Sequence, residues 1–222
     1  MACTAILFDL DGTLVDTAGD LGWALNQVLG DIGRGPLSIE EVRGMIGGGI
    51  AALVSLGLEA TGGPVEESQL EDMASKCKDL YNEHIADQSL PYPGVPETLP
   101  ILAGMGVRMG VCTNKPESAS RKLLSELGID SWLPVVIGGD SLPVRKPDPQ
   151  MANAVMNQLG ISKEQAVLVG DSITDVELAR GAGLPVILVS YGYSNDPIDS
   201  LGADKIITNF SMLEECIKSF DT

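Results

Sequence analysis

Asp9 and Asp11 are the residues whose types and spacing most directly indicate chemistry in this chain of 222 residues. They follow the apolar run 5–8, and on an extended strand end residues i and i+2 point the same way. Like charges this close are unfavourable unless a cation lies between them or one of them is protonated. The pair therefore indicates a site for a hard metal ion and a nucleophile. The alternative is an acidic turn, because Asp-Gly is an ordinary turn pair.

Two further segments carry polar residues where strands are expected to end. Thr113 and Asn114 follow the apolar run 108–112, and their hydroxyl and amide groups suit an anion near a helix N-terminus. Both residue types are also common at turns and helix caps. Lys146 precedes Pro147, which fixes the backbone after it, so that its cation has a set place. The alternative for Lys146 is an ordinary charged, proline-rich loop.

A second pair of carboxylates, Asp171 and Asp175, follows the apolar run 166–169. Asp171 is expected at the strand tip and Asp175 one helical turn later, where simple helix capping is the alternative role. Four strands would thus bring acidic, hydroxyl and ammonium groups to one edge of a sheet. That edge is where open α/β sheets bind their ligands, so we expect one functional site there.

The C-terminal half alternates short apolar runs with helical patterns. Strands are predicted at 108–112, 134–137, 166–169, 185–189 and 205–207, and helices at 117–127, 150–159, 174–182 and 211–219. Alternating helices and strands rich in Val, Ile and Leu are typical of a parallel sheet covered by helices. The expected fold class is therefore α/β.

The stretch 16–90 has helical periodicity and no convincing strand. Helices are predicted through 21–32, from Ser38, directly after residue 49, and over 66–87. Ser38 and Glu41 have the spacing of a capping box. We expect a helical domain over 16–90, inserted into an α/β domain of 1–15 and 91–222.

Composition excludes several classes of function. The net charge of −17 argues against nucleic acids and anionic membranes, because phosphate contacts need clustered Lys and Arg. No apolar run reaches the length of a membrane span, and no leader pattern precedes the first strand. Cys3, Cys77, Cys112 and Cys216 lack metal-ligand spacing and are expected to be reduced thiols. The single histidine, His84, argues against a histidine zinc site. We expect a cytoplasmic protein.

The strand-end segments resemble the haloacid dehalogenase superfamily of phosphohydrolases. The matching positions, in the family's order, are residues 9–13, Thr113, Lys146 and residues 170–175. The resemblance covers essentially the whole chain and implies a Rossmann-like parallel-sheet core with an inserted small α-helical cap. Within the superfamily the chain looks most like the phosphoglycolate phosphatases, on residues 41–49 and 191–193.

The resemblance implies a Mg²⁺-dependent phosphomonoesterase that acts through an aspartyl-phosphate on a small phosphorylated metabolite, with 2-phosphoglycolate as the expected substrate. Asp9 would be the nucleophile, and Asp11 would protonate the leaving oxygen and later deprotonate water. Mg²⁺ would be held by Asp9, the Asp11 backbone carbonyl and Asp171, with Asp175 as a neighbour or additional ligand. The phosphate oxygens would be bound by backbone N–H groups near Leu10, Gly12 and Thr13, and by Thr113, Asn114 and Lys146.

In the helical segment, Arg43 and the glycines Gly47, Gly48 and Gly49 could receive a substrate carboxylate. The alternative is an exposed helix residue followed by a tight turn. Other phosphatases of the superfamily, a sugar phosphomutase and a non-catalytic binding protein remain open, because the core motifs are shared. The sequence also leaves open whether the chain is a monomer or a homodimer.

Overall fold

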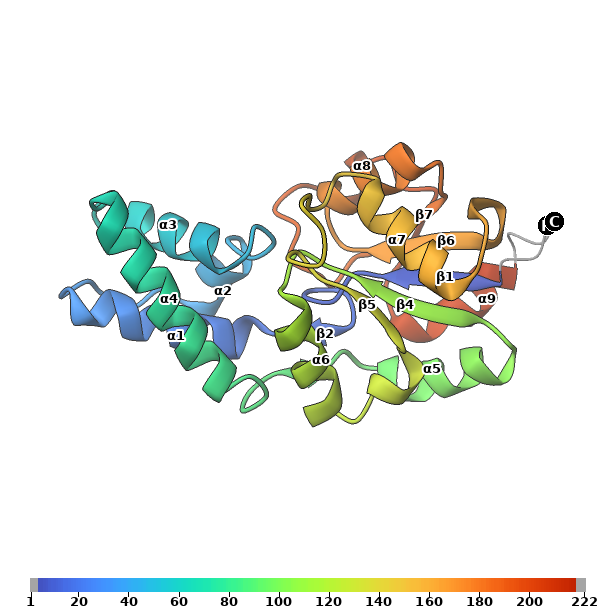
Figure 1. Ribbon diagram of the computed structural model, residues 1–222, viewed down its shortest axis with the longest axis horizontal. Helices are drawn as coiled ribbons and strands as arrows, with labels where there is room; N and C mark the ends of the chain where they lie inside the picture. The colour runs from blue at the N-terminus through green and yellow to red at the C-terminus, as the bar shows by residue number, and fades with distance from the viewer. Residues whose placement is uncertain (1–3, 219–222) are drawn as a thin grey trace. The chain divides into compact units, whose positions relative to one another are not determined.

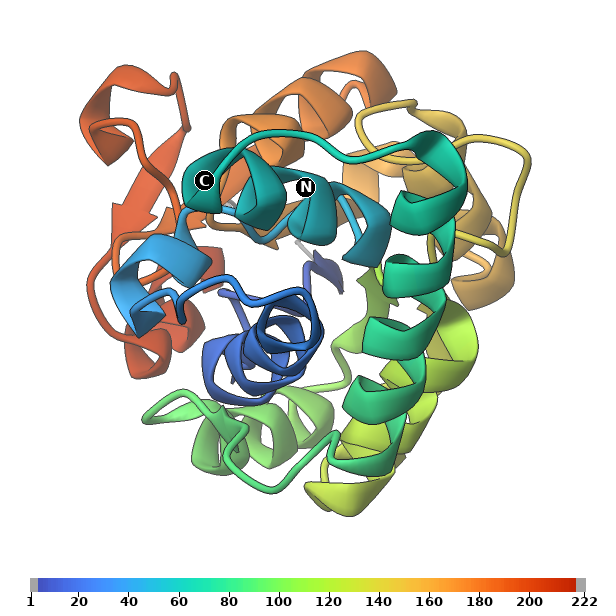
Figure 2. The same ribbon diagram turned by 90° about the vertical axis from the view of Figure 1, so that its left-hand side faces the viewer.

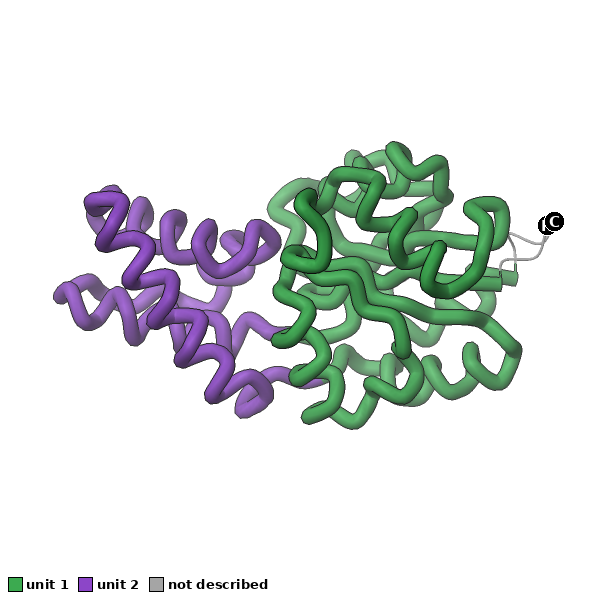
Figure 3. Tube along the Cα trace, in the orientation of Figure 1, with its two compact units in different colours: residues 1–16, 91–222 green, residues 17–90 purple. Residues whose placement is uncertain are grey.

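A computed structural model describes residues 4–218 of the chain. The chain divides into two compact units, shown in green and purple in Figure 3. The first, called here the sheet unit, comprises the residues up to Asp16 and those from Pro91 on. The second, the helical unit, is Thr17–Leu90.

The sheet unit is built on six parallel strands in the order β5-β4-β1-β6-β7-β8. Their bounds are β1 (Ala5–Phe8), β4 (Arg108–Cys112), β5 (Val135–Ile137), β6 (Ala166–Gly170), β7 (Val186–Val189) and β8 (Lys205–Ile207). β1 lies between β4 and β6, with Phe8 opposite Val111 on one side and Val169 on the other. The predicted α/β fold with a parallel sheet is therefore confirmed.

Helices cover both faces of this sheet (Figure 1). α7 (Gln150–Leu159) and α8 (Ile173–Ala182) lie on one face, and α5 (Val95–Gly104), α6 (Glu117–Glu126) and α9 (Leu213–Lys218) lie on the other. Successive strand residues point to opposite faces. Leu7 belongs to the apolar core formed with α7 and α8, whereas the ring of Phe8 lies 5.7 Å from that of Phe210. Burial on both faces explains why the strands read as continuous apolar runs.

Some elements differ from the sequence prediction. Helix α5 was not predicted, because it contains Pro96 in its first turn and Pro100 in its interior. The two-residue strands β2 (Val15–Asp16) and β3 (Leu90–Pro91) pair with each other and are too short to show a pattern. Beside them, the carbonyl of Leu14 accepts a hydrogen bond from the N–H of Tyr92 at 3.0 Å.

The last helix also starts later than predicted. Residues Phe210–Met212 form a 3₁₀ turn, and α9 begins only at Leu213. The predicted end of this helix, at Ser219, lies outside the described residues.

The helical unit consists of the four helices that periodicity predicts. They are α1 (Ala18–Asp31), α2 (Ile39–Arg43), α3 (Ile50–Thr61) and α4 (Glu67–Glu83). The long α4 packs against α1 and α3, as Figure 2 shows. The predicted capping box at the start of α2 is present, with the Ser38 N–H donating to Glu41 at 2.8 Å. The two ends of this unit are joined by hydrogen bonds: the buried carboxylate of Asp20 accepts the N–H groups of Gln88 and Ser89.

Cys77, Cys112 and Cys216 are free thiols, as expected, and Cys3 lies outside the described residues. Within residues 4–218, no helix combines the length and apolarity that crossing a bilayer requires.

Candidate active site

Asp9 follows the central strand β1 directly. Its N–H donates to the carbonyl of Val169 at 2.9 Å, so the strand pairing continues up to the aspartate and fixes its backbone. β1 has β4 on one side and β6 on the other, so the strand order switches direction here. Such switch points form the ligand crevice at the carboxyl edge of open α/β sheets. Asp9 thus stands at the centre of that edge.

Two more carboxylates gather around Asp9. Asp171 follows β6 and Asp175 belongs to the first turn of α8, so both lie in the segment that follows the strand next to β1. Each of the three residues is buried and offers one oxygen, and these oxygens all lie within 4.8 Å of one another. Three buried carboxylate oxygens this close together are suited to a divalent cation.

Lys146 supplies a buried ammonium group to the same cluster. Its Nζ lies 2.7 Å from Asp9 Oδ1 and 2.8 Å from Asp175 Oδ1. Burial alone would lower the pKa of Lys146, but the charges of Asp175 and Asp9 outweigh it and raise the pKa above its ordinary value. Lys146 therefore stays charged and neutralises part of the acidic cluster.

The aspartates respond to burial in the opposite sense. Burial raises the pKa of Asp9 to about 7, although the ammonium of Lys146 opposes the shift. Burial, followed by the charges of Asp9 and Asp175, also raises the pKa of Asp171 well above its ordinary value. Without a cation between them, ionisation of one of these carboxylates makes ionisation of the next less favourable. Protons and metal ions therefore compete for the carboxylates of Asp9 and Asp171.

Both carboxylate oxygens of Asp175 are already in use. Oδ1 accepts from Lys146, and Oδ2 accepts the N–H groups of Asp171 and Ser172 at 3.2 Å each. The hydroxyl of Ser172 also donates to Oδ2 at 2.7 Å, and Ser172 and Asp175 form a capping box at the start of α8. The capping role that was the alternative for Asp175 is thus present.

Asp171 is held by a segment that strand-end reasoning missed. Its Oδ2 accepts the N–H of Tyr193 at 2.6 Å. Gly12 and Gly192 both lie against this side chain, where a Cβ on either glycine would collide with Asp171 atoms. In the sequence, residues 191–193 were noted only for their family resemblance. The contact from the Tyr193 N–H could not be predicted there, because a backbone N–H is present whatever the side chain. The hydroxyl of Tyr193 also donates to Asp16 at 2.6 Å.

Asn114 contacts the backbone of Lys146 with its side chain. Its Oδ1 accepts the N–H of Lys146 at 2.9 Å, and its Nδ2 donates to the Lys146 carbonyl at 3.4 Å. The sequence led us to expect this amide among the phosphate-binding groups. In the structure the amide fixes the backbone that carries the buried ammonium, and its role in binding phosphate stays a prediction.

Thr113 contacts Lys115, and Lys115 in turn contacts Asp11. Thr113 is buried, and its hydroxyl oxygen accepts the N–H of Lys115 at 3.2 Å. The Lys115 Nζ lies 3.0 and 3.3 Å from the two carboxylate oxygens of Asp11. Sequence reasoning did not select Lys115, because a lysine before a helix is ordinary.

The turn after Asp9 uses some of the expected backbone donors itself. The N–H of Gly12 donates to the Val15 carbonyl at 2.9 Å, and that of Thr13 donates to the Leu10 carbonyl at 3.3 Å. A phosphate would therefore have to compete for these two groups. The Thr13 hydroxyl is buried and has no hydrogen-bond partner within residues 4–218.

The four residues proposed for a substrate carboxylate belong to the helical unit. Arg43 lies 3.5 Å from Glu40, its neighbour one turn earlier in α2. Gly47 and Gly49 have φ values of 127° and 87°, which other residues rarely adopt. Gly49 is the N-cap of α3, and Gly48 lies close to Ala52. The turn role is present, and a role in binding substrate stays a prediction.

A family model described as haloacid dehalogenase-like hydrolase matches residues 6–189. Among curated proteins, a phosphoglycolate phosphatase of Caulobacter vibrioides is 42% identical over 205 residues, which cover 92% of this chain and 86% of that protein. A phosphoglycolate phosphatase of Rhodospirillum rubrum is 42% identical over 215 residues, which cover 94% and 88%.

Solved structures give the same result. A protein of Haemophilus somnus, described as a predicted phosphoglycolate phosphatase, superposes with a TM-score of 0.91 at 32% identity and covers 96% of this chain and 97% of its own. A second, from Lactobacillus delbrueckii, superposes with a TM-score of 0.87 at 27% identity and covers 98% and 99%.

Proposed function

The chain belongs to the haloacid dehalogenase-like hydrolase family, and from that membership we propose that it is a Mg²⁺-dependent phosphomonoesterase that hydrolyses 2-phosphoglycolate through an aspartyl-phosphate on Asp9. The observation that carries the proposal is the buried group at the end of β1, where Asp9 contacts Lys146 and lies beside Asp171. It combines a carboxylate nucleophile, a fixed cation and oxygen ligands for a hard metal ion.

The donor set fits Mg²⁺. Asp9 and Asp171 offer carboxylate oxygens, and the backbone carbonyl of Asp11 is the third protein ligand that we propose. Asp175 has both oxygens engaged, so we assign it to orienting Lys146 and Asp171. The ammonium groups of Lys115 and Lys146 pair with Asp11, Asp9 and Asp175, and a divalent cation beside Asp9 and Asp171 would balance the remaining acidic charge. When bound, Mg²⁺ would draw charge from a phosphate oxygen and reduce repulsion between phosphate and carboxylates.

The reaction divides into two displacements at phosphorus. In the first, an Asp9 oxygen forms a bond to phosphorus while the bond from phosphorus to the substrate oxygen breaks, and Asp11 gives its proton to that oxygen. In the second, water attacks the aspartyl-phosphate, Asp11 takes a proton from the water, and the bond to Asp9 breaks. The enzyme returns to its starting state, and the net change is ester plus water to alcohol plus phosphate.

Charge on the transferring phosphoryl group would be stabilised by donors from neighbouring strands. We assign this role to the ammonium of Lys146, the hydroxyl of Thr113 and the N–H of Leu10. Lys146 and Thr113 are buried, so each donor acts in a setting where water screens charge poorly. Asn114 contributes by fixing the backbone of Lys146.

The choice of 2-phosphoglycolate rests on the relatives' names, since two phosphoglycolate phosphatases match more than nine-tenths of this chain at 42% identity. This substrate carries a carboxylate beside its phosphate. We propose that the helical unit, as a cap, receives that carboxylate with Arg43 and the turn of Gly47, Gly48 and Gly49. We further propose that the protein is cytoplasmic.

A phosphate-release assay tests the function. With Mg²⁺, purified protein should hydrolyse 2-phosphoglycolate with a higher kcat/KM than a sugar phosphate or p-nitrophenyl phosphate, and EDTA should abolish turnover. Asp9→Asn should remove activity, whereas Asp199→Asn, on an exposed carboxylate of the sheet unit, should keep it.

Each part of the proposal has its own contrary result. Turnover that survives EDTA contradicts the metal requirement, and full activity of Asp9→Asn contradicts the nucleophile. Accumulation of an isomerised sugar phosphate without free phosphate would identify a mutase instead. A higher kcat/KM for another phosphate ester would refute only the substrate.

A further inference from the structure

Lys115 forms a nearly buried ion pair with Asp11. The side chain of Lys115 is 4% exposed and that of Asp11 is 14% exposed. Nζ lies 3.0 Å from Oδ1 and 3.3 Å from Oδ2, so a single ammonium contacts both oxygens. The two residues are 104 positions apart in the chain. A lysine stem buried this deeply loses its rotamer freedom, so its ammonium has a defined place rather than a mobile one.

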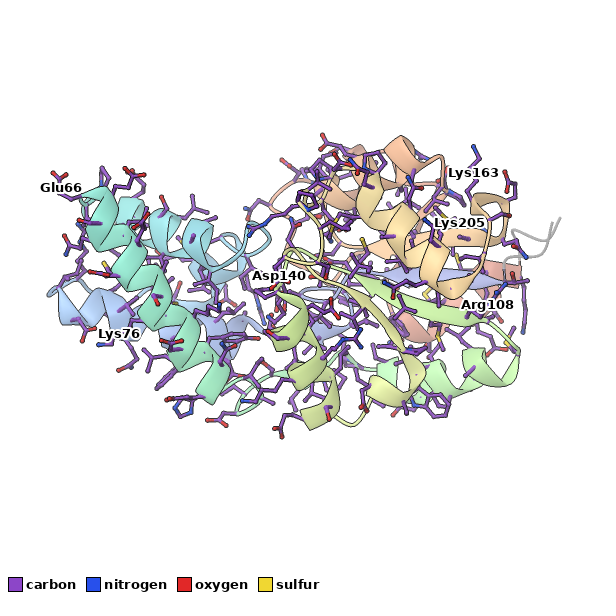
Figure 4. All side chains as sticks on the ribbon, viewed as in Figure 1. Glu66, Lys76, Arg108, Asp140, Lys163 and Lys205 are labelled. Carbon is purple, nitrogen blue, oxygen red and sulfur yellow. The ribbon has the colours of Figure 1, made fainter. Side chains whose placement is uncertain are left out.

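The backbone of Lys115 is fixed on both sides. Its N–H donates to the Thr113 hydroxyl at 3.2 Å, and its carbonyl accepts the N–H of Gly139 at 2.9 Å. A Cβ on Gly138 would come within 2.7 Å of that carbonyl oxygen, so the loop after β5 packs closely on Lys115. Asp140, labelled in Figure 4, accepts the N–H of Glu117 at 2.8 Å and holds the same loop at the start of α6. The ammonium therefore projects from a rigid base.

The two buried lysines of the site divide the carboxylates between them. Lys146 contacts Asp9 and Asp175, and Lys115 contacts Asp11. The cation next to the residue that handles the proton is thus a different one from the cation next to the nucleophile.

We propose that Lys115 is a positioning residue for Asp11, which holds its carboxyl group in the orientation for proton transfer to the leaving oxygen and offsets the charge that remains afterwards. The inference rests on the proposed function, in which Asp11 is the proton donor and acceptor. The ammonium contacts both oxygens, Oδ1 at 3.0 Å and Oδ2 at 3.3 Å, so it restrains the orientation of the carboxyl group.

The proton balance shows when the ammonium matters. While the bond from phosphorus to the leaving oxygen breaks, the Asp11 proton moves to that oxygen, and Asp11 becomes a carboxylate beside Lys115. A positive charge at this distance stabilises the new carboxylate. In the second displacement the attacking water gives a proton back to Asp11.

Substrates with different leaving groups separate this role from a structural one. An alkoxide must be protonated as it leaves, whereas p-nitrophenolate leaves without a proton. We expect Lys115→Met to lower kcat/KM for an alkyl phosphate such as 2-phosphoglycolate by about 100-fold, the usual size of a general-acid contribution. For p-nitrophenyl phosphate we expect a loss of no more than about 5-fold, because that contribution is not needed there.

A double-mutant cycle tests whether Lys115 acts through Asp11. In an Asp11→Asn background, Lys115→Met should cause little further loss with the alkyl phosphate. Lys163→Met is the matched control. Its exposed side chain lies at the end of the sheet unit away from Asp140 in Figure 4, and both substrates should keep their wild-type rates.

The outcomes are distinct. Equal losses for the two esters, or a loss that persists in the Asp11→Asn background, overturn the proposal and assign Lys115 to the phosphoryl group or to folding. If Lys115→Met does not fold, Lys115→Arg keeps the charge but moves it. Lys115→Arg should then lower kcat/KM less than expected for Lys115→Met, and still more for the alkyl phosphate than for p-nitrophenyl phosphate. Equal losses of kcat/KM for the two esters overturn the proposal. A wild-type protein that hydrolyses neither ester instead refutes the proposed function itself.

Discussion

The side-chain amide of Asn114 pairs with the backbone of Lys146 at both ends, accepting its N–H at 2.9 Å and donating to its carbonyl at 3.4 Å. Asn114 follows β4 and Lys146 belongs to the loop after β5, so the contact joins two neighbouring strand ends. It sets where the lysine stem begins and hence where its ammonium meets Asp9 and Asp175. The position of a cation at the site depends on an amide that need not touch the substrate.

The Asn114 contact predicts a catalytic loss without loss of fold. Asn114→Ala should lower kcat by about 10- to 100-fold, because small displacements of a charge-stabilising group are costly at the transition state. Steady-state kinetics measure the loss, and circular dichroism checks the fold. Asn153→Ala, on the exposed side of α7, is the control and should be neutral. Unchanged kcat in Asn114→Ala would show that Lys146 holds its place without the amide.

Asp9→Asn should stabilise the metal-free protein while it removes activity. The folded pKa of Asp9 is about 7 against an ordinary 3.8, so at about pH 8 folding requires ionisation of a group that burial disfavours. Asparagine avoids that penalty, and we expect a gain on the order of 1–3 kcal/mol. Urea unfolding in EDTA measures it. A gain at about pH 8 that is clearly smaller near pH 5 supports the argument, and destabilisation at both values contradicts it.

Mg²⁺ should stabilise the protein more as the pH rises. Because the folded pKa of Asp9 lies above its unfolded value, the metal-free fold binds more protons than the unfolded chain between about pH 4 and 7. Its unfolding free energy therefore falls as pH rises through that window. Asp171 acts in the same direction.

Protons compete with the metal for these carboxylates, so the rise in Tm on adding MgCl₂ should be small near pH 5 and larger near pH 8. Differential scanning calorimetry with and without MgCl₂ gives the comparison. An Mg²⁺ shift of equal size at both pH values would mean that the metal binds elsewhere.

Gly192→Ala should weaken the metal site through Asp171. A Cβ at this position would collide with the Asp171 side chain, which also accepts the Tyr193 N–H. The carboxylate must move, so we expect a 10-fold or larger rise in the Mg²⁺ concentration required for half activity, as is typical when a group supporting a ligand is disturbed. Gly104→Ala, which meets open space in α5, is the control. Equal Mg²⁺ requirements in the two variants would count against the role of Gly192.

The strand ends of the sheet were predictable because their signals are local. A run of Val, Ile and Leu predicts a buried strand, and the polar residue that ends the run marks the carboxyl edge. This logic placed Asp9, Lys146 and Asp171 at one edge. In the structure Lys146 lies 2.7 Å from Asp9, and oxygens of Asp9 and Asp171 lie within 4.8 Å of each other. The capping box of Ser38 and Glu41 was predictable for the same reason, because it spans only four residues.

The contacts that sequence reasoning missed depend on long-range packing. Lys115 contacts Asp11 only because β4 lies beside β1. The N–H of Tyr193 donates to Asp171, and since every residue except proline has a backbone N–H, the residue type does not reveal this contact. Helix α5 was missed for a local reason, since Pro100 in its interior argues against a helix. There the packing of Leu99 and Leu102 in the core overrides the local preference.

The hydrogen bond from the Tyr92 N–H to the Leu14 carbonyl has an evolutionary consequence. The chain leaves the sheet unit just after Leu14 and re-enters it just before Tyr92, so everything between is a loop whose two ends already meet. Loop length then changes the free energy of the surrounding fold only slowly. Lineages could exchange residues 17–90 for an insert of another length while the strand ends kept their chemistry. The same junction is the place to graft a foreign cap, or to excise this one.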